Sequence, residues 1–186
     1  MGTYLNPGNA QFQKAINNNP YVDKSGLLAE LNKKINTNDC FVCVSRPRRF
    51  GKTMAANMLS AYYGCGSDTA GMFAGLEIEN HPSFRQHLNK YNVIFLNMAD
   101  MIRRSSASDM ISRIERSLTH EFSKAYPDIQ AELYETFIDY LKAVYEETGI
   151  GMVVIIDEWD CIFRLNPNDD EAQKDYLDFL RDFLKD

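Results

Sequence analysis

One stretch of this chain limits its fold more than any other: a short apolar segment, then a basic loop, then a segment suited to a helix. Residues 40–45 read Cys-Phe-Val-Cys-Val-Ser, an apolar run of strand length that is rich in β-branched side chains. Residues 46–53 read Arg-Pro-Arg-Arg-Phe-Gly-Lys-Thr, and residues 54–63 contain neither glycine nor proline before Gly64. We therefore predict a strand, a loop and a helix in that order.

The loop fits the phosphate-binding (Walker A) pattern Gly-x-x-x-x-Gly-Lys-[Ser/Thr] except that Arg46 replaces the first glycine. Pro47 favours an extended Arg46, so the strand can end there without strain. Gly51 allows the backbone to curl, so that successive N–H groups converge on a phosphate at the start of the next helix. We expect Lys52 to reach the β- and γ-phosphates and the Thr53 hydroxyl to ligate Mg²⁺.

A second apolar strand ends in two carboxylates. Residues 152–156 read Met-Val-Val-Ile-Ile, and Asp157 and Glu158 follow, as in a Walker B pattern. Ligands of open α/β sheets collect at the carboxyl ends of the strands. We expect Asp157 to hold the Mg²⁺ shell and Glu158 to orient and deprotonate a water that attacks the γ-phosphate. The alternative is that the two acids cap the following helix.

The remaining pattern predicts the fold class. Residues 92–98 form another apolar strand, and apolar side chains recur at helical spacing over residues 25–35, 110–122, 133–144 and 172–184, with a capping box at 106–109. Strands that alternate with helices predict a parallel sheet covered on both faces. The extra strand between loop and carboxylates indicates the ATPase (additional-strand) branch of the α/β P-loop NTPases. We divide the chain into an extension with one helix, residues 1–39, and a partial core, residues 40–186.

The nucleotide preference follows from two absences in the sequence. GTPases use Asn-Lys-x-Asp to recognise guanine, and this chain has no such segment. Residue 160 is Asp, where the Asp-x-x-Gly motif of GTPases has a glycine that binds the γ-phosphate. We therefore predict ATP, with Mg²⁺, as the cofactor.

Four cations lie within seven residues of the loop: Arg46, Arg48, Arg49 and Lys52. The arginines have three interpretations: a bidentate clamp on phosphate, a contact to a partner's acids or to nucleic acid, and a solvated basic loop. The whole chain has 20 Lys and Arg against 26 Asp and Glu, a net charge of −6. Binding of nucleic acid through bulk charge is therefore disfavoured.

The cysteines and the N-terminus indicate a reduced, cytoplasmic protein. Cys40 and Cys43 form a Cys-x-x-Cys pair, but no second pair completes a zinc site. In a strand these two thiols point to opposite faces, so we expect them, like Cys65 and Cys161, to be buried and reduced. No apolar run has the length of about 18–20 residues that a membrane span needs, and the N-terminus has no signal-peptide pattern.

Three motifs in order resemble the prokaryotic AAA-ATPase-like family. Its members carry Y-V-D-K-[ST], R-P-R-R-F-G-K-[ST] and D-E-[YW]-D, and this chain has Tyr-Val-Asp-Lys-Ser at 21–25, the loop at 46–53 and Asp-Glu-Trp-Asp at 157–160. The family's own arginine at position 46 removes the difficulty of the missing glycine. The resemblance implies ATP binding and Mg²⁺-dependent hydrolysis, with Lys52 and Glu158 in the catalytic roles. It assigns these loop residues to the nucleotide: Arg46, Pro47, Arg48, Arg49, Phe50, Gly51, Lys52 and Thr53.

The first of these motifs has two interpretations. In related ATPases the segment before the first strand passes near the base, which implies an adenine contact for Tyr21, Asp23 and Lys24. The alternative is that this segment only packs the extension on the core. Trp159 is interpreted as core packing or a stacking surface, and Asp160 as a helix cap or a partner of a bound water.

The resemblance also implies that more chain follows in typical members: a sensor strand, a lid and often a nuclease-like domain of the PD-(D/E)XK class. We therefore expect a truncated core, with an exposed sheet edge that favours self-association. Two alternatives to an ATPase module stay open. One is a nucleotide-gated binding module without useful turnover, and the other is a nucleic-acid-binding module that uses the arginines.

Overall fold

The computed structural model describes residues 2–45, 47, 50–102 and 107–184, and the chain divides into two compact units. Unit 1 consists of Met1–Ile94 and Gly151–Ile155, and unit 2 of Phe95–Ile150 and Ile156–Asp186. Both units are discontinuous in the sequence, because the boundary between them runs across a pair of strands.

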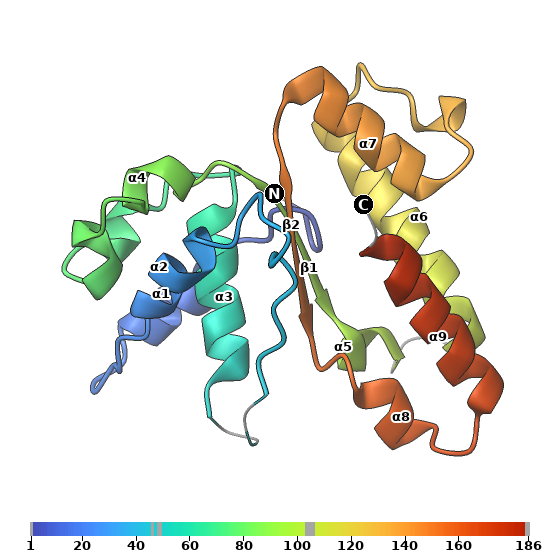
Figure 1. The fold of residues 1–186 in the computed structure, drawn as a ribbon, viewed down its shortest axis with the longest axis horizontal. Helices are drawn as coiled ribbons and strands as arrows, with labels where there is room; N and C mark the ends of the chain where they lie inside the picture. Colours follow the sequence, from blue (N-terminus) through green and yellow to red (C-terminus); the bar gives the residue numbers. More distant parts are fainter. Residues whose placement is uncertain (1, 46, 48–49, 103–106, 185–186) are drawn as a thin grey trace. The chain divides into compact units, whose positions relative to one another are not determined.

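Two parallel strands, β1 (Asn92–Asn97) and β2 (Met152–Asp157), form the sheet (Figure 1). Val93, Ile94 and Leu96 of β1 are completely buried. The chain's N-terminus supports the start of β1, because Leu5 makes an antiparallel bridge to Ile94. The strands predicted at 92–98 and 152–156 are confirmed as β1 and β2, which pair with each other, although Met98 already belongs to the following helix.

The strand predicted at residues 40–45 is wrong in this structure. These residues form no strand and run as an exposed trace between α2 (Gly26–Asn32) and α3 (Lys52–Tyr63) (Figure 1). Phe41 is 61% exposed and Val44 is 52% exposed. The residues have β propensity, but propensity mostly reflects packing against a neighbouring strand, and none pairs with this segment. The expected three-stranded core is accordingly a two-stranded one among the described residues.

The same correction applies to two of the cysteines. Cys40 and Cys43 are exposed rather than buried, because the segment that carries them joins no sheet. Cys161 is buried, as predicted, and Cys65 is only partly buried.

Unit 1 packs short helices around α3. Its other elements are α1 (Ala10–Ile16), α4 (Phe84–His87) and two 3-10 helices, η1 (Ala70–Phe73) and η2 (Glu77–Asn80). α1 packs on α3, and Phe12 of α1 stacks on Phe73 with ring centroids 5.2 Å apart. Tyr62 of α3 makes edge contacts to Phe73 and Tyr63. This aromatic core holds the helix that begins at the phosphate loop.

A buried amide joins α2 to the end of α3. Asn32, 5% exposed, donates from Nδ2 to the hydroxyl oxygens of Tyr62 at 3.0 Å and Ser83 at 2.7 Å. Its Oδ1 accepts from the Tyr63 hydroxyl at 2.8 Å. The Tyr62 hydroxyl in turn donates to the Phe84 carbonyl oxygen at 2.9 Å. Every polar group of the Asn32 side chain is therefore satisfied, which a buried amide requires.

Unit 2 is mainly helical, and its amphipathic patterns were readable from the sequence. Its elements are α5 (Met98–Ile102), α6 (Ala107–Ala125), η3 (Ala131–Leu133), α7 (Phe137–Thr148), α8 (Cys161–Leu165) and α9 (Asp170–Phe183). The apolar stripe of α6 is completely buried: Met110, Ile114, Leu118 and Phe122. Ser106 of the predicted capping box lies outside the described residues. No described helix is long and apolar enough to cross a membrane.

Candidate nucleotide site

The chain turns at Gly51, where the sequence predicts the end of a phosphate-binding loop. Gly51 is the N-cap of α3 and has φ +80°, in the left-handed region where glycine costs least. Lys52 and Thr53 are the first two residues of α3, and the Gly51 carbonyl accepts from Ala55 N–H at 2.9 Å. Phe50 is 60% exposed. The backbone thus turns at Gly51 and delivers two polar side chains into the first helical turn.

The predicted arginines contribute no geometry here. Arg46, Arg48 and Arg49 lie outside the described residues. Pro47 is exposed between them. Their assignment to phosphate therefore rests on the sequence alone.

The Tyr-Val-Asp-Lys-Ser segment meets this loop. Lys24 Nζ donates to the Phe50 carbonyl oxygen at 3.0 Å. Asp23 accepts from the backbone N–H of Ser25 at 2.7 Å and of Glu77 at 2.8 Å. Partial burial acts to raise the pKa of Asp23, but the bonds from Glu77 and Ser25 outweigh it, so the pKa lies below its ordinary value. For Tyr21, burial and then the charge of Asp23 raise the pKa.

The carboxylates at the end of β2 form a second cluster, within unit 2. Asp157 is 7% exposed and its Oδ1 accepts from Glu158 N–H at 3.0 Å. Glu158 has φ +55°, an uncommon conformation for a residue with a side chain. Its carboxylate pairs with Arg164 of α8. Arg164 Nε also lies 3.0 Å from Asp160 Oδ2, so one guanidinium serves two acids.

Sequence reasoning missed Arg164. Asp160 and Arg164 stand four residues apart in a segment that forms a helix, and this spacing places opposite charges on one face. The contact of Arg164 with Glu158 had no such signal, because Glu158 lies before the helix begins and its direction depends on the backbone turn at that residue. Asp160 does not cap α8 with its side chain.

Trp159 is less buried than expected. Its side chain is 46% exposed and meets Phe163 edge to face, with centroids 6.3 Å apart. Its carbonyl accepts from the Tyr176 hydroxyl at 2.9 Å, which ties this turn to α9. The neighbouring Cys161 thiol is buried, and desolvation raises its pKa to about 11.

Each unit thus assembles one part of the predicted site. Unit 1 brings Lys24, Phe50 and Gly51 together, with Lys52 and Thr53 next in the chain. Unit 2 brings Asp157, Glu158 and Arg164 together. Among the described residues, no group of three or more histidine, cysteine or acidic side chains could hold a metal ion.

Comparison with known proteins adds one finding. A family model described as a predicted AAA-ATPase matches residues 7–186, and so covers the Tyr-Val-Asp-Lys-Ser segment, the loop and the carboxylates. No curated protein and no solved structure matches the chain.

Proposed function

The chain belongs to the predicted AAA-ATPase family, and on this premise we propose that it binds ATP with Mg²⁺ and hydrolyses it as the motor or switch module of a larger cytoplasmic protein. The observation that carries the proposal is the turn at Gly51, with φ +80°, followed by Lys52 and Thr53 in the first turn of a twelve-residue helix. The start of a helix presents backbone N–H groups and the positive end of the helix dipole to an anion. We infer the P-loop NTPase fold for residues 40–186.

In this proposal Lys52 neutralises charge on the β- and γ-phosphates, and the loop's N–H groups hold the phosphate oxygens. Family resemblance adds the arginine cluster as further phosphate or partner contacts. Tyr21 and Asp23 belong to the segment that reaches the loop, and we assign them to its support.

Mg²⁺ suits the donors that remain. This ion keeps several waters and usually takes one or two protein oxygens together with phosphate oxygens. Thr53 offers a hydroxyl in the first turn of α3, and Asp157 offers a carboxylate at the end of a buried strand. Each is a hard oxygen donor of the kind that Mg²⁺ prefers, and on the sequence motifs alone we assign both to the ion, which would neutralise charge on the phosphates when bound.

Glu158 is the proposed base. Its side chain is 36% exposed, so water reaches it, and its position next to Asp157 matches the acid pair of ATPases. The carboxylate takes a proton from water as the water oxygen bonds to the γ-phosphorus. The bond from that phosphorus to the bridging oxygen breaks, and its electron pair leaves with ADP.

Two variants test this division of roles. Lys52→Ala should abolish ATP binding measured by calorimetry, while Lys14→Ala, an equal charge change on the exposed face of α1, should not. Glu158→Gln should leave ATP binding intact and stop phosphate release. Unchanged ATP affinity in a folded Lys52→Ala protein would refute residues 46–53 as the phosphate site.

A second candidate is a nucleotide-gated binding module with little turnover. The ion pair between Glu158 and Arg164 favours it, because the guanidinium occupies a carboxylate oxygen that would otherwise bind the attacking water. Wild-type protein that binds ATP but releases no more phosphate than Glu158→Gln would support this candidate.

A further inference from the structure

We propose that Lys24 is a positioning residue for the phosphate loop. Its ammonium holds the Phe50 carbonyl, and through it the left-handed turn at Gly51 from which α3 begins. The inference deepens the proposed function and rests on it for the effect on ATP, but not for the effect on the loop itself.

The geometry places the ammonium against two consecutive loop residues. Lys24 Nζ lies 3.0 Å from the Phe50 carbonyl oxygen. A Cβ added to Gly51 would also lie 3.0 Å from Lys24 Nζ, which is tighter than an ordinary contact. The amine is therefore bonded to the carbonyl of the peptide that joins Phe50 to Gly51 and also lies next to Gly51. A donor in this place limits rotation of that peptide, and the rotation sets the direction of the next N–H groups.

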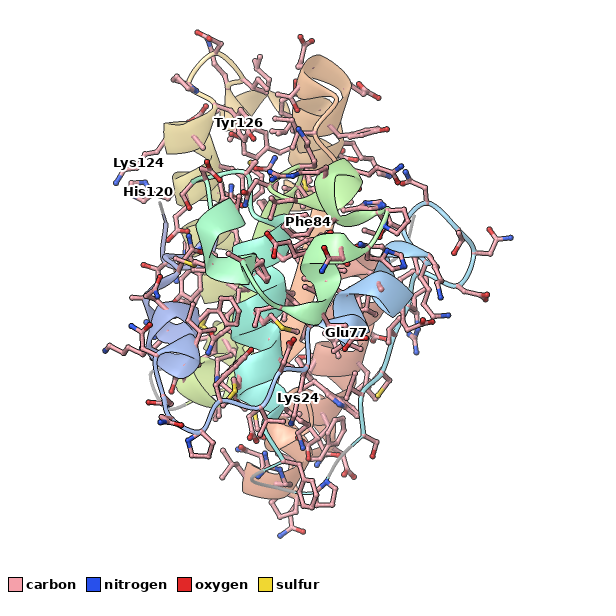
Figure 2. All side chains as sticks on the ribbon, turned by 90° about the vertical axis from the view of Figure 1, so that its left-hand side faces the viewer. Lys24, Glu77, Phe84, His120, Lys124 and Tyr126 are labelled. Atoms are coloured by element: carbon pink, nitrogen blue, oxygen red, sulfur yellow. The ribbon has the colours of Figure 1, made fainter. Side chains whose placement is uncertain are left out.

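The base of Lys24 is held by a separate clamp. Asp23 bridges the backbone N–H groups of Ser25 and Glu77, and Ser25 Oγ accepts from Ile78 N–H at 3.1 Å. Ser25 is completely buried. Lys24 and Glu77 lie on the same face of unit 1, as labelled in Figure 2. The segment that carries the ammonium is thus anchored on η2, away from the loop.

Close packing next to the clamp limits how far this anchor can shift. A Cβ at Gly26 would lie 2.7 Å from Glu77 Oε2, so α2 begins directly against that side chain. Leu27 N–H and Leu28 N–H bond to the Lys24 and Ser25 carbonyls at 3.1 and 2.9 Å, which starts α2 immediately after the motif. Asp23 and Ser25 therefore fix the backbone of the motif, and the Lys24 side chain extends from it to the Phe50 carbonyl.

This arrangement separates two interpretations of the motif. An adenine contact needs the amine free to face a base, whereas here it is committed to a backbone carbonyl of the loop. The ammonium also brings a positive charge to the loop beside Lys52, where an anion benefits from it without direct contact.

The expected size of the effect follows from the exposure of the bond. A hydrogen bond from a charged donor that water can replace is modest, so we expect removal of the amine to weaken ATP binding about threefold to tenfold. The loop should still form, but it should open more often.

The test compares Lys24→Met with Lys24→Arg and Lys14→Met. Met keeps the length and the helix tolerance of the side chain, Arg restores a charged donor, and Lys14 is an exposed lysine of α1 with the same charge change. The first readout is amide hydrogen exchange at Ala55 without nucleotide, because that N–H is bonded to the Gly51 carbonyl. The second readout is ATP affinity by calorimetry.

We expect faster exchange at Ala55 and weaker ATP binding in Lys24→Met, recovery in Lys24→Arg, and no change in Lys14→Met. Unchanged exchange in Lys24→Met would overturn the inference, even if ATP affinity fell, since the lysine would then act on the nucleotide directly. Equal changes in Lys14→Met would also overturn it. If the wild type binds no ATP, the proposed function fails, whereas the exchange experiment still decides the role of Lys24.

Discussion

The turn at Gly51 yields a quantitative prediction, because the chain contains its own control positions. Gly51 and Gly75 both have positive φ, +80° and +78°, whereas Gly71 has no positive φ and nothing within 4 Å of an added Cβ. Nothing lies within 4 Å of a Cβ at Gly75 either. Alanine at these three positions therefore separates the cost of backbone conformation from the cost at the loop.

The magnitudes can be estimated position by position. A left-handed alanine costs about 1–2 kcal/mol, and the reduced freedom of the unfolded chain offsets about 0.4–1 kcal/mol of this. Gly51→Ala and Gly75→Ala should each lose roughly 0–1.6 kcal/mol, which for a chain of this size lowers Tm by up to about 6 °C. Gly71→Ala has no left-handed conformation to pay for and gains only from the reduced freedom of the unfolded chain, so its Tm should rise slightly. The contact with Lys24 adds little at Gly51, because a flexible side-chain end can move.

Thermal unfolding by circular dichroism and ATP titration by calorimetry test both parts. Only Gly51→Ala should also lose ATP affinity, by roughly fivefold to thirtyfold if the whole conformational cost of about 1–2 kcal/mol opposes the binding geometry. A Gly51→Ala protein that melts like Gly71→Ala would refute the left-handed turn at position 51. An equal loss of affinity in Gly75→Ala would refute the link between that turn and the nucleotide.

Two further predictions concern burial. Asn32→Ala removes three side-chain hydrogen bonds from a buried site, so we expect the free energy of unfolding to fall by roughly 2–3 kcal/mol and Tm by about 4–12 °C. Asn18→Ala, at an exposed position, is the control. An equal effect of both substitutions would contradict the hydrogen-bond network of Asn32. Exposed Cys40 and Cys43 should react quickly with a thiol reagent at pH 8. Cys161 is buried and its pKa is raised to about 11, so roughly 0.1% of it is thiolate at pH 8, and it should react only as the pH rises toward 11. Mass spectrometry of the modified peptides checks the order, and early labelling of Cys161 would contradict it.

The parts of the fold that sequence predicted share one property: their apolar side chains have a partner close enough to bury them. The stripe of α6 was predictable because helix periodicity alone decides which residues face inward. The strands at 92–97 and 152–157 were predictable because each apolar run has the other as its neighbouring strand. The segment at 40–45 has an equally apolar pattern, but a strand also needs a neighbouring edge, and no local pattern reports whether one is present.

The site divides in the same way. Gly51 was predictable because few residues other than glycine adopt its backbone conformation readily. The contacts of Lys24 with Phe50 and of Arg164 with Glu158 were not, because each depends on where two backbone segments turn. Motifs identified the chemical groups of the candidate site, but not the side chains that hold them.

The discontinuity of unit 1 has a consequence for how the protein is made in the cell. Residues Met1–Ile94 leave the ribosome first, but Gly151–Ile155, which complete this unit, follow only after roughly 60 more residues. At about 5–20 residues per second this delay lasts roughly 3–12 s. During it, β1 lacks the strand that pairs with it. The unpaired edge of β1 can associate with other chains unless such encounters are slow or a chaperone covers it. The soluble yield should therefore change with translation speed.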